Sequence, residues 1–591
     1  MKLSQKYLKR KFLLLILFNG IITGLIAQST AFPESIIIKN PGQKDFSLVS
    51  GNDLATILVD KKDNATVRLC AGIFADDVLR VTGRRPLFIN NPSDAAKSCV
   101  IIGSINESRI IKQLVASGKI DVQGIRGKWE SCLTQIIDNP LPGIKKGLVI
   151  AGSDRRGTAY GIFELSKQIG VSPWYFFADV PPEKRDEIYI KAGRYILKSP
   201  SVKYRGIFIN DEMWGLRPWA LYTFAPEEGK GLGPKTYAKI FELLLRLKAN
   251  IIWTAMHQQT KPFNCYEENK VIADKYGIVA SSGEPMLCSN IAGANWDREY
   301  PDEPWNYVKN RDHIYKYWEN RIKINGKYEN MYSLGKRGKD DESSPEINVP
   351  VLNQIIKDQR RILRNWVNKD ITKVPQFILL YSEILGVYNE GLDLPEDITI
   401  CWPDDNFGNI RQLPNAEEQQ RSGGSGIYYH FQWLNGATTA YTWTCTTPLA
   451  LTWFEMKKAY DYNAKKLWVV NVGDIKPAEI NIEYFMQLAW DISSWDQHTT
   501  CQFLKAWATR EFGEKYASCI ADILMKHYEL GYARRPENMV MYNGRNDELS
   551  WEWFSIDNYN DEAQKRIDAY DTLIKQVDKI YHSLPDKYKD A

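Results

Sequence analysis

Eight short apolar runs between Arg205 and Asp474 each end in an acidic, imidazole or amide side chain, and stretches with helical spacing separate them. The first run is Tyr204-Arg-Gly-Ile-Phe-Ile-Asn-Asp211 and the last is Leu467-Trp-Val-Val-Asn-Val-Gly-Asp474. Strands that alternate with helices in this way predict an α/β fold in which a parallel sheet closes into a (β/α)8 barrel. Catalytic groups of such barrels lie at the carboxyl ends of the strands, so the residues that end the runs are the candidates for a site.

The sequence on either side of the barrel pattern predicts further units. Basic residues precede an apolar run from Phe12 to Ile26, and the small residue Ala27 follows, which predicts a signal peptide over residues 1–27 and a periplasmic or secreted protein. We expect an N-terminal α/β domain over residues 28–199, because short β-branched runs alternate with helical spacing there. The barrel takes residues 200–480. The pattern is then wholly helical, which predicts a helical domain over residues 481–591.

Composition excludes several classes of function. The chain of 591 residues carries 76 basic and 72 acidic residues and a net charge of +4. It therefore lacks the excess of basic residues that nucleic-acid binding requires. Beyond the N-terminal run no apolar stretch approaches the length of a membrane span, so we expect no membrane partner. The nine cysteines are scattered, with no Cys-x-x-Cys pair, and indicate neither a disulfide framework nor a zinc site. The many aromatic rings suit the faces of sugars, although large cores use them equally.

The strand ends supply the groups that glycoside hydrolysis needs. This reaction requires one protonated carboxyl to assist the leaving oxygen and one carboxylate to drive a nucleophile. Glu383 follows the apolar run Phe377-Ile-Leu-Leu-Tyr381, where partial desolvation would favour its protonated form. Asp341 lies in a charged turn in which Arg337 or Lys339 would keep it ionised as a base. Each has a structural alternative, because a strand-end acid often caps the next helix and a charged turn is often only solvated.

The densest polar cluster at any strand end spans residues 402–408. Adjacent side chains point in different directions, so at most one of Asp404 and Asp405 faces a pocket while the other secures the loop. Asn406 and His430 would hydrogen-bond sugar hydroxyls, although a satisfied core role is the alternative for a lone histidine. No metal-ligand spacing accompanies these residues, so we predict no metal site and no cofactor.

Several ordered motifs of the chain resemble those of glycoside hydrolase family 115. They are Arg205-Gly-Ile-Phe-Ile-Asn-Asp-Glu212, Trp253-Thr-Ala-Met-His257, Glu284-Pro-Met286, Trp402-Pro-Asp-Asp-Asn406, Tyr428-Tyr-His430 and Trp468-Val-Val-Asn-Val-Gly-Asp474. Members of that family are inverting α-glucuronidases that remove glucuronic acid or its 4-O-methyl ether from xylan side chains. The resemblance implies an inverting α-glucuronidase that acts on glucuronoxylan or its oligosaccharides without a cofactor.

The resemblance also implies a pocket at the mouth of the barrel. Glu383 and Asp341 are the expected catalytic pair, and Asp211 and Asp404 are the reserves. Inversion requires the two carboxyl groups to stand roughly 6.5–9.5 Å apart, which leaves room for a water molecule. The expected substrate-binding residues are Glu212, Trp214, His257, Glu284, Arg337, Asp340, Asn406, Tyr428 and His430.

The carboxylate of a uronic acid needs a cation or a set of donors. A guanidinium meets that need best, because it can bind a carboxylate through two parallel hydrogen bonds. Arg337 is the candidate for this contact. Arg205, at the start of the first strand, is expected to serve a buried structural pair instead.

Several positions depart from the family pattern. Lys336 and Lys339 stand where the turn near Arg337 usually has a methionine and an acid, and the usual histidine before Glu284 is missing. The loop after His430 also differs. Family members usually continue into a further β-rich module, so we expect a truncated helical domain, and the missing module would bear on substrate contact or on a homodimer. These departures leave two alternatives open, a non-catalytic carbohydrate-binding homologue and a glycosidase that acts on another acidic glycan.

Overall fold

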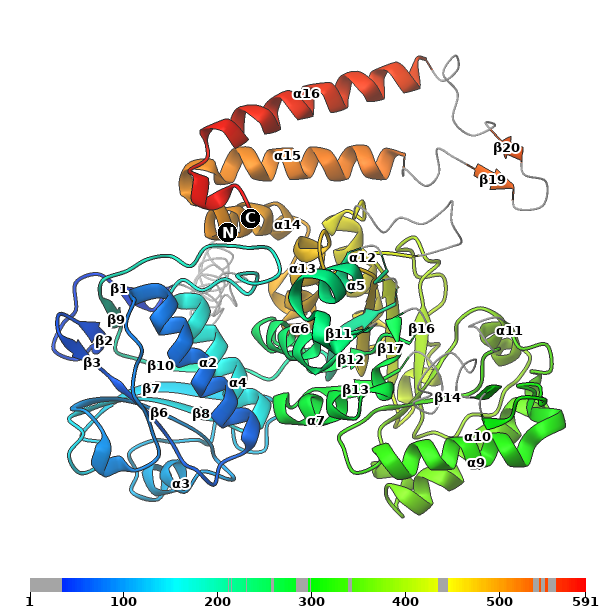
Figure 1. The fold of residues 1–591 in the computed structure, drawn as a ribbon, viewed down its shortest axis with the longest axis horizontal. Helices are drawn as coiled ribbons and strands as arrows, with labels where there is room; N and C mark the ends of the chain where they lie inside the picture. The colour runs from blue at the N-terminus through cyan, green and yellow to red at the C-terminus, as the bar shows by residue number, and fades with distance from the viewer. Residues whose placement is uncertain are drawn as a thin grey trace, which may run out of the picture.

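The computed structural model describes residues 35–591 apart from 211, 214, 230, 257–259, 283–295, 298, 339–342, 434–444, 535–540, 544–547 and 551–559. The described parts of the chain form four sheets and the helices that surround them (Figure 1). An N-terminal unit built on a six-stranded sheet lies beside an eight-stranded barrel. The last helices lie above both in the view of Figure 1.

The N-terminal unit is a mixed sheet with helices on both faces. Its strands β4 and β6 are parallel to β5 and β8, whereas β7 and β10 pair antiparallel at one edge. Successive strand residues point to opposite faces, so Ile57 and Leu58 lie in different cores, the first with helices α2 and α4 and the second with α3. The elements in sheet order are β10 (Arg194–Leu197), β7 (Cys132–Asp138), β8 (Lys146–Gly152), β6 (Ser98–Ser104), β4 (Thr56–Val59) and β5 (Phe88–Ile89), with α2 (Ala65–Thr82), α3 (Arg109–Ala116) and α4 (Arg155–Gln168). A small antiparallel sheet contains β1 (Ile37–Ile38), β9 (Ile188–Ile190), β2 (Phe46–Ser50) and β3 (Asp53–Leu54).

Eight parallel strands form the barrel that the sequence predicts. The strands are β11 (Tyr204–Ile209), β12 (Ile251–Trp253), β13 (Val279–Ser281), β14 (Tyr332–Leu334), β15 (Gln376–Leu379), β16 (Thr399–Pro403), β17 (Ser425–His430) and β18 (Leu467–Val472). Their order around the sheet is β13-β12-β11-β18-β17-β16-β15-β14. The two ends of this order meet at a parallel bridge, where Ala280 N donates to Glu329 O and Met331 N donates to Ala280 O, both at 3.2 Å. The (β/α)8 prediction is therefore confirmed.

Side chains rather than open space fill the interior of the barrel. The inward-facing residues of its strands form an apolar cluster that contains Phe208, Trp253, Phe377 and Tyr428. The rings of Trp253 and Phe377 stack at 4.9 Å, so aromatic side chains pack the barrel interior beneath the carboxyl ends of the strands. The helices around the strands are α6 (Pro234–Arg246), α7 (Glu267–Tyr276), α9 (Tyr307–Asn325), α10 (Val349–Trp366), α11 (Glu383–Asn389) and α12 (Leu449–Asp461).

The C-terminal part is mainly but not wholly helical. Helix α13 (Glu479–Trp490) packs on α12, and α15 (Glu514–Ala533) packs between α14 (Thr499–Phe512) and α16 (Glu562–Ser583). The expectation of a wholly helical pattern is wrong at one place, because β19 (Met541–Asn543) and β20 (Glu548–Ser550) pair as an antiparallel hairpin. Each strand has only three residues, which is too short for an alternating pattern to show. Within the described part of the chain, no helix combines the length and the apolar character that a membrane span requires.

A buried cluster of charges joins the N-terminal unit to the amino end of the barrel. Glu130 is fully buried and accepts hydrogen bonds from Arg156 at 2.6 Å, Arg205 at 2.7 Å and Asn250 at 2.8 Å. Arg205 lies in β11, so the prediction of a buried structural pair for this residue is confirmed. Because Arg156 also binds Glu329 at 2.8 Å, the start of α4 is fixed to the loop before β14.

Candidate active site

Arg337 and Glu383 meet at the mouth of the barrel. The Arg337 side chain donates to Oε2 of Glu383 at 2.5 Å, and the Glu383 side chain is 21% exposed. Ser382, directly before Glu383, has φ +56°, a backbone conformation that costs a non-glycine residue about 1–3 kcal/mol and that clusters at functional sites. The turn from β15 into α11 thus presents Glu383 at the carboxyl end of its strand.

A second set of contacts holds Glu383 from the loop after Arg337. Ser344 N donates to Oε1 of Glu383 and the hydroxyl of Ser343 donates to Oε2, both at 3.3 Å. Lys336 fixes this loop, because its fully buried ammonium group donates to Ser344 Oγ at 2.7 Å and to Glu346 at 2.8 Å. Burial opposes the ionisation of Glu346, but Lys336 lowers the pKa of Glu346 below its ordinary value. Lys336, which departs from the family pattern, therefore forms a structural ion pair that supports the loop next to Glu383.

Two aromatic rings and a histidine stand beside this pair. The Arg337 guanidinium lies 5.9 Å from the ring centre of Tyr381, and the Tyr381 ring lies 6.1 Å from that of His430. The ring of Tyr428 lies 4.4 Å from His430, and the Tyr428 hydroxyl accepts a hydrogen bond from the side chain of Asn471 at 3.1 Å. Strands β14, β15, β17 and β18 therefore bring their carboxyl-end residues to one place.

The two adjacent acids after β16 have different surroundings, as expected. Asp404 is buried and its carboxylate contacts His430. Asp405 secures its own loop, where it accepts hydrogen bonds from Asn409 N at 3.1 Å and from Arg411 at 2.6 Å. Burial opposes the ionisation of Asp405, but these bonds lower its pKa below the ordinary value.

A second chain of hydrogen bonds links the loops after β17, β18 and β11. The side-chain oxygen of Gln432 accepts from Gly473 N at 2.5 Å and from Asp474 N at 2.9 Å. The Asp474 carboxylate in turn accepts from Leu216 N at 2.5 Å. Burial raises the pKa of Asp474 to about 6, although the N–H groups of Leu216 and Gly215 oppose this shift. The loop that follows β11 is thus fixed to the loop that follows β18, the neighbouring strand.

The structure brings together Arg337, Glu383, Asp404, Tyr428 and His430 of the predicted site. Glu212 is fully buried in the loop after β11, and Asn406, which has φ +67°, donates its N–H to Asp404 at 3.1 Å. The other predicted residues lie outside the described part of the chain, so their positions stay predictions. They are Asp211, Trp214, His257, Glu284, Asp340 and Asp341.

Sequence reasoning missed four residues that line or support this mouth. Tyr381 ends the fifth apolar run and Asn471 lies in the last one, so their places at strand ends are a signal that was available. Asp474 was noted as a strand end but received no role. Gln432 carried no signal, because nothing in its sequence surroundings shows that it binds the backbone of the next strand's loop.

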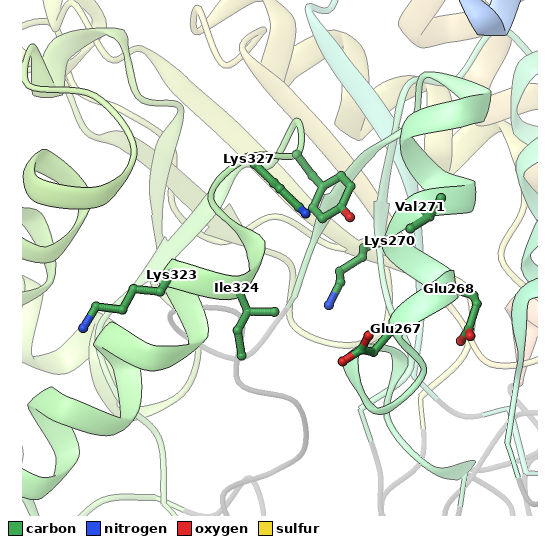
Figure 2. A pocket seen from close by; sticks show the side chains of 8 residues that line it. Glu267, Glu268, Lys270, Val271, Lys323, Ile324 and Lys327 are labelled. Carbon is green, nitrogen blue, oxygen red and sulfur yellow. The ribbon is translucent and has the colours of Figure 1, made fainter.

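Among the described residues, cavities also lie away from the mouth. A groove of about 410 Å³ lies between α7 and the end of α9, and Figure 2 shows that its lining includes Glu267, Glu268 and Lys270 on one side and Lys323 and Lys327 on the other. A second cavity, of about 550 Å³, lies between α4 and α13 and ends at Trp490 and Trp495. Neither contains a predicted site residue. Among the described residues there is also no group of three or more histidine, cysteine or acidic side chains that could hold a metal ion.

Comparisons with known proteins identify relatives of the chain. A model of glycosyl hydrolase family 115 matches residues 197–538. A solved family GH115 4-O-methyl-α-glucuronidase, BtGH115A, which has specificity for decorated arabinogalactans, is 36% identical, with a TM-score of 0.83 over 92% of this chain and 70% of that chain. CpGH89 from Clostridium perfringens, solved with GlcNAc-α-1,4-galactose, is 11% identical, with a TM-score of 0.51 over 79% of this chain and 56% of that chain, which is a likeness of fold alone. A search of curated proteins gives no match.

Proposed function

Because this chain belongs to glycoside hydrolase family 115, we propose that it hydrolyses α-linked glucuronic acid, or its 4-O-methyl ether, from a plant polysaccharide with inversion. The observation that carries this proposal is the contact at 2.5 Å between Arg337 and Glu383 in the barrel mouth. A carboxyl group is the reacting group of most glycosidases, and a guanidinium is the best partner for the acid group of a uronic acid sugar.

The proposed chemistry uses two carboxyl groups on separate loops. Glu383 is one of them, and Asp341 on the loop after β14 is its proposed partner. In an inverting reaction one carboxyl gives a proton to the leaving oxygen while the other activates water on the opposite face of the sugar. Glu383 accepts from Arg337, Ser343 and Ser344, so donors face both of its oxygens, an arrangement that suits an acceptor of protons better than a donor. We therefore assign Glu383 to the base and Asp341 to the acid, which reverses the roles that the sequence favoured.

Arg337 contacts both the substrate and the catalytic carboxylate in this proposal. A guanidinium has five N–H donors in a planar fork, so a bond to Glu383 is compatible with a second contact to the sugar carboxylate. The same residue would then select a uronic acid and orient the catalytic carboxylate. Tyr381 borders the mouth next to it and offers a flat face for the sugar ring, with the buried ring of Tyr428 packed against it.

Glucuronoxylan is the first proposed substrate, and arabinogalactan that carries glucuronic acid is the second. The second candidate is favoured by the specificity of BtGH115A for decorated arabinogalactans, together with the changed loops around the mouth. Incubation of the protein with each polysaccharide, followed by chromatography of the released uronic acid, tests both. Release from one of them supports the proposal and identifies the polymer.

No release from any glucuronic-acid-bearing substrate, combined with calorimetric binding of an aldouronic acid, would instead identify a carbohydrate-binding protein without turnover. Release of a different acidic sugar would identify a glycosidase of another specificity. Export from the cytoplasm is part of the proposal, on the support of the basic and apolar segment before residue 28. Mass spectrometry of the protein from its native host should find an N-terminus near residue 28.

A further inference from the structure

We propose that Asp404 is a positioning residue that acts through His430: it orients the imidazole ring and keeps a proton on Nδ1, so that Nε2 meets the substrate. Asp404 would then have no reaction with the sugar itself, in contrast to the reserve catalytic role expected from the sequence. The identity of the ligand rests on the proposed function, but the position of the proton on the His430 ring does not.

The contacts of Asp404 leave no part of its carboxylate for a substrate. Oδ1 accepts from Asn406 N at 3.1 Å and lies 2.5 Å from His430 Nδ1. Oδ2 accepts from Gly408 N at 3.0 Å and from His430 N at 3.1 Å. A carboxylate has about four acceptor sites, and all are used. The side chain of Asp404 is also 0% exposed.

The same contacts decide which nitrogen of His430 carries the proton. Backbone N–H groups only donate, so the three that point at Asp404 require acceptor lone pairs on both of its oxygens. An ionised carboxylate cannot donate, so the short contact at Oδ1 exists only if His430 Nδ1 bears a hydrogen. The neutral ring therefore has its lone pair on Nε2.

Nε2 of His430 is placed to meet a ligand. This atom is buried and has no hydrogen-bond partner among the described residues. A buried polar atom without a partner is costly, so its presence beside the candidate active site points to a role with a ligand. The ring contacts Tyr428 and Tyr381, and Tyr381 lies beside Arg337, which places Nε2 in the same mouth as Glu383. A hydroxyl group of the sugar is the donor that fits an imidazole acceptor.

Nitrogen NMR of the full chain with ¹⁵N-labelled histidine tests the proton position directly. The chain has 6 histidines, and His430→Gln identifies the signals of His430 by their loss. We expect Nδ1 to carry a proton at every pH at which the protein is folded, with Nε2 unprotonated in the neutral ring. A neutral ring protonated at Nε2 in the unsubstituted protein would overturn the proposal. This result needs no substrate, so it is distinct from a failure of the proposed function.

A double-substitution cycle on kcat/KM tests whether Asp404 acts through His430. We expect Asp404→Asn and His430→Gln each to lower kcat/KM on the order of 10–100-fold, the effect of one lost hydrogen bond. We expect the double variant to be no worse than the worse single variant, because both changes remove one function. A double variant whose loss equals the product of the two single losses would contradict the proposal.

Asp405→Asn is the matched control for this cycle. It makes the same chemical change in the same loop, but Asp405 binds Asn409 and Arg411 rather than His430. We expect it to keep the NMR signals of His430 and a kcat/KM within about 3-fold of the unsubstituted protein. A loss as large as that of Asp404→Asn would assign the effect to the loop as a whole and overturn the proposal.

Discussion

Glu383 is held by donors on both of its oxygens, and this arrangement explains what its loss should do. Replacement by glutamine keeps the shape, but it turns one acceptor oxygen into an N–H donor and removes the charge that activates water in the proposed mechanism. We expect Glu383→Gln to lower kcat by at least about 10²–10⁴-fold, the contribution of one acid–base group, with the circular dichroism spectrum unchanged. Glu390→Gln, an exposed change at the end of the same helix, should leave kcat unaltered. Full activity in Glu383→Gln would remove Glu383 from the mechanism.

Lys336 supports the catalytic loop through a buried ion pair. Lys336→Met restores the usual family residue but leaves Glu346 without its cation and Ser344 without a donor. We expect a loss of up to about 3–5 kcal/mol in the free energy of unfolding and a lower kcat, because Ser344 holds Glu383. Urea denaturation and initial rates measure these effects. Lys373→Met, which breaks an exposed pair with Asp370, should leave the unfolding free energy almost unchanged, and equal losses in both variants would contradict the assigned role.

Single residues of the site were predictable where the sequence placed a charged group at a strand end. Glu383 and Arg337 are in contact, and their strand-end positions identified both as candidates. The choice between Asp404 and Asp405 was beyond the sequence, because it depends on which side chain reaches His430. The role of Lys336 was not predictable. The sequence showed only that this lysine departs from the family pattern, whereas the structure shows that it is buried in an ion pair with Glu346.

The loops at the barrel mouth should respond to pH through Asp474. Its pKa is raised to about 6 in the folded protein, so the folded form binds a proton more tightly than the unfolded chain. The stabilisation is fully present below the ordinary carboxyl pKa and is lost as the pH rises through about 6. We expect the unfolding free energy of the unsubstituted protein, relative to that of Asp474→Asn, to fall by up to roughly 3 kcal/mol between about pH 4 and 7. Urea denaturation across this range measures the difference.

Asp405→Asn serves as a control, because its effect on the unfolding free energy should depend on pH with the opposite sign. The pKa of Asp405 is lowered, so its contribution is present above the ordinary pKa and is lost as the pH falls. A pH-independent difference between the unsubstituted protein and Asp474→Asn would show that burial does not shift the titration of Asp474.

Strands and helices were predictable because each one repeats a local pattern. Short apolar runs, separated by stretches with helical spacing, located all eight barrel strands. The contacts between loops were not predictable, since Leu216 and Asp474 are 258 residues apart and meet only after the barrel has closed. The β19–β20 hairpin was missed because strands of three residues carry too little pattern.

The attachment of the N-terminal unit to the barrel depends on Glu130. Replacement by glutamine removes the charge that compensates Arg156 and Arg205 in a buried cluster. We expect Glu130→Gln to lower the free energy of unfolding by about 3–5 kcal/mol, because two guanidinium groups lose their shared partner. The kcat of the folded fraction should not change, since the cluster lies at the amino end of the strands, away from the mouth. Glu107→Gln, an exposed change in the same unit, should be neutral, and a neutral Glu130→Gln would contradict the role given to the cluster.

The whole molecule is an α/β barrel enzyme of family 115. We propose that two of its carboxyl groups act from opposite sides of a sugar. Proton NMR during hydrolysis of a 4-O-methylglucuronic-acid-bearing oligosaccharide follows the anomer of the released acid before mutarotation. The proposed mechanism predicts that the β-anomer appears first from the α-linked substrate and that Glu383→Gln releases neither anomer. First appearance of the α-anomer would contradict inversion, and equal release by Glu383→Gln would contradict the proposed site.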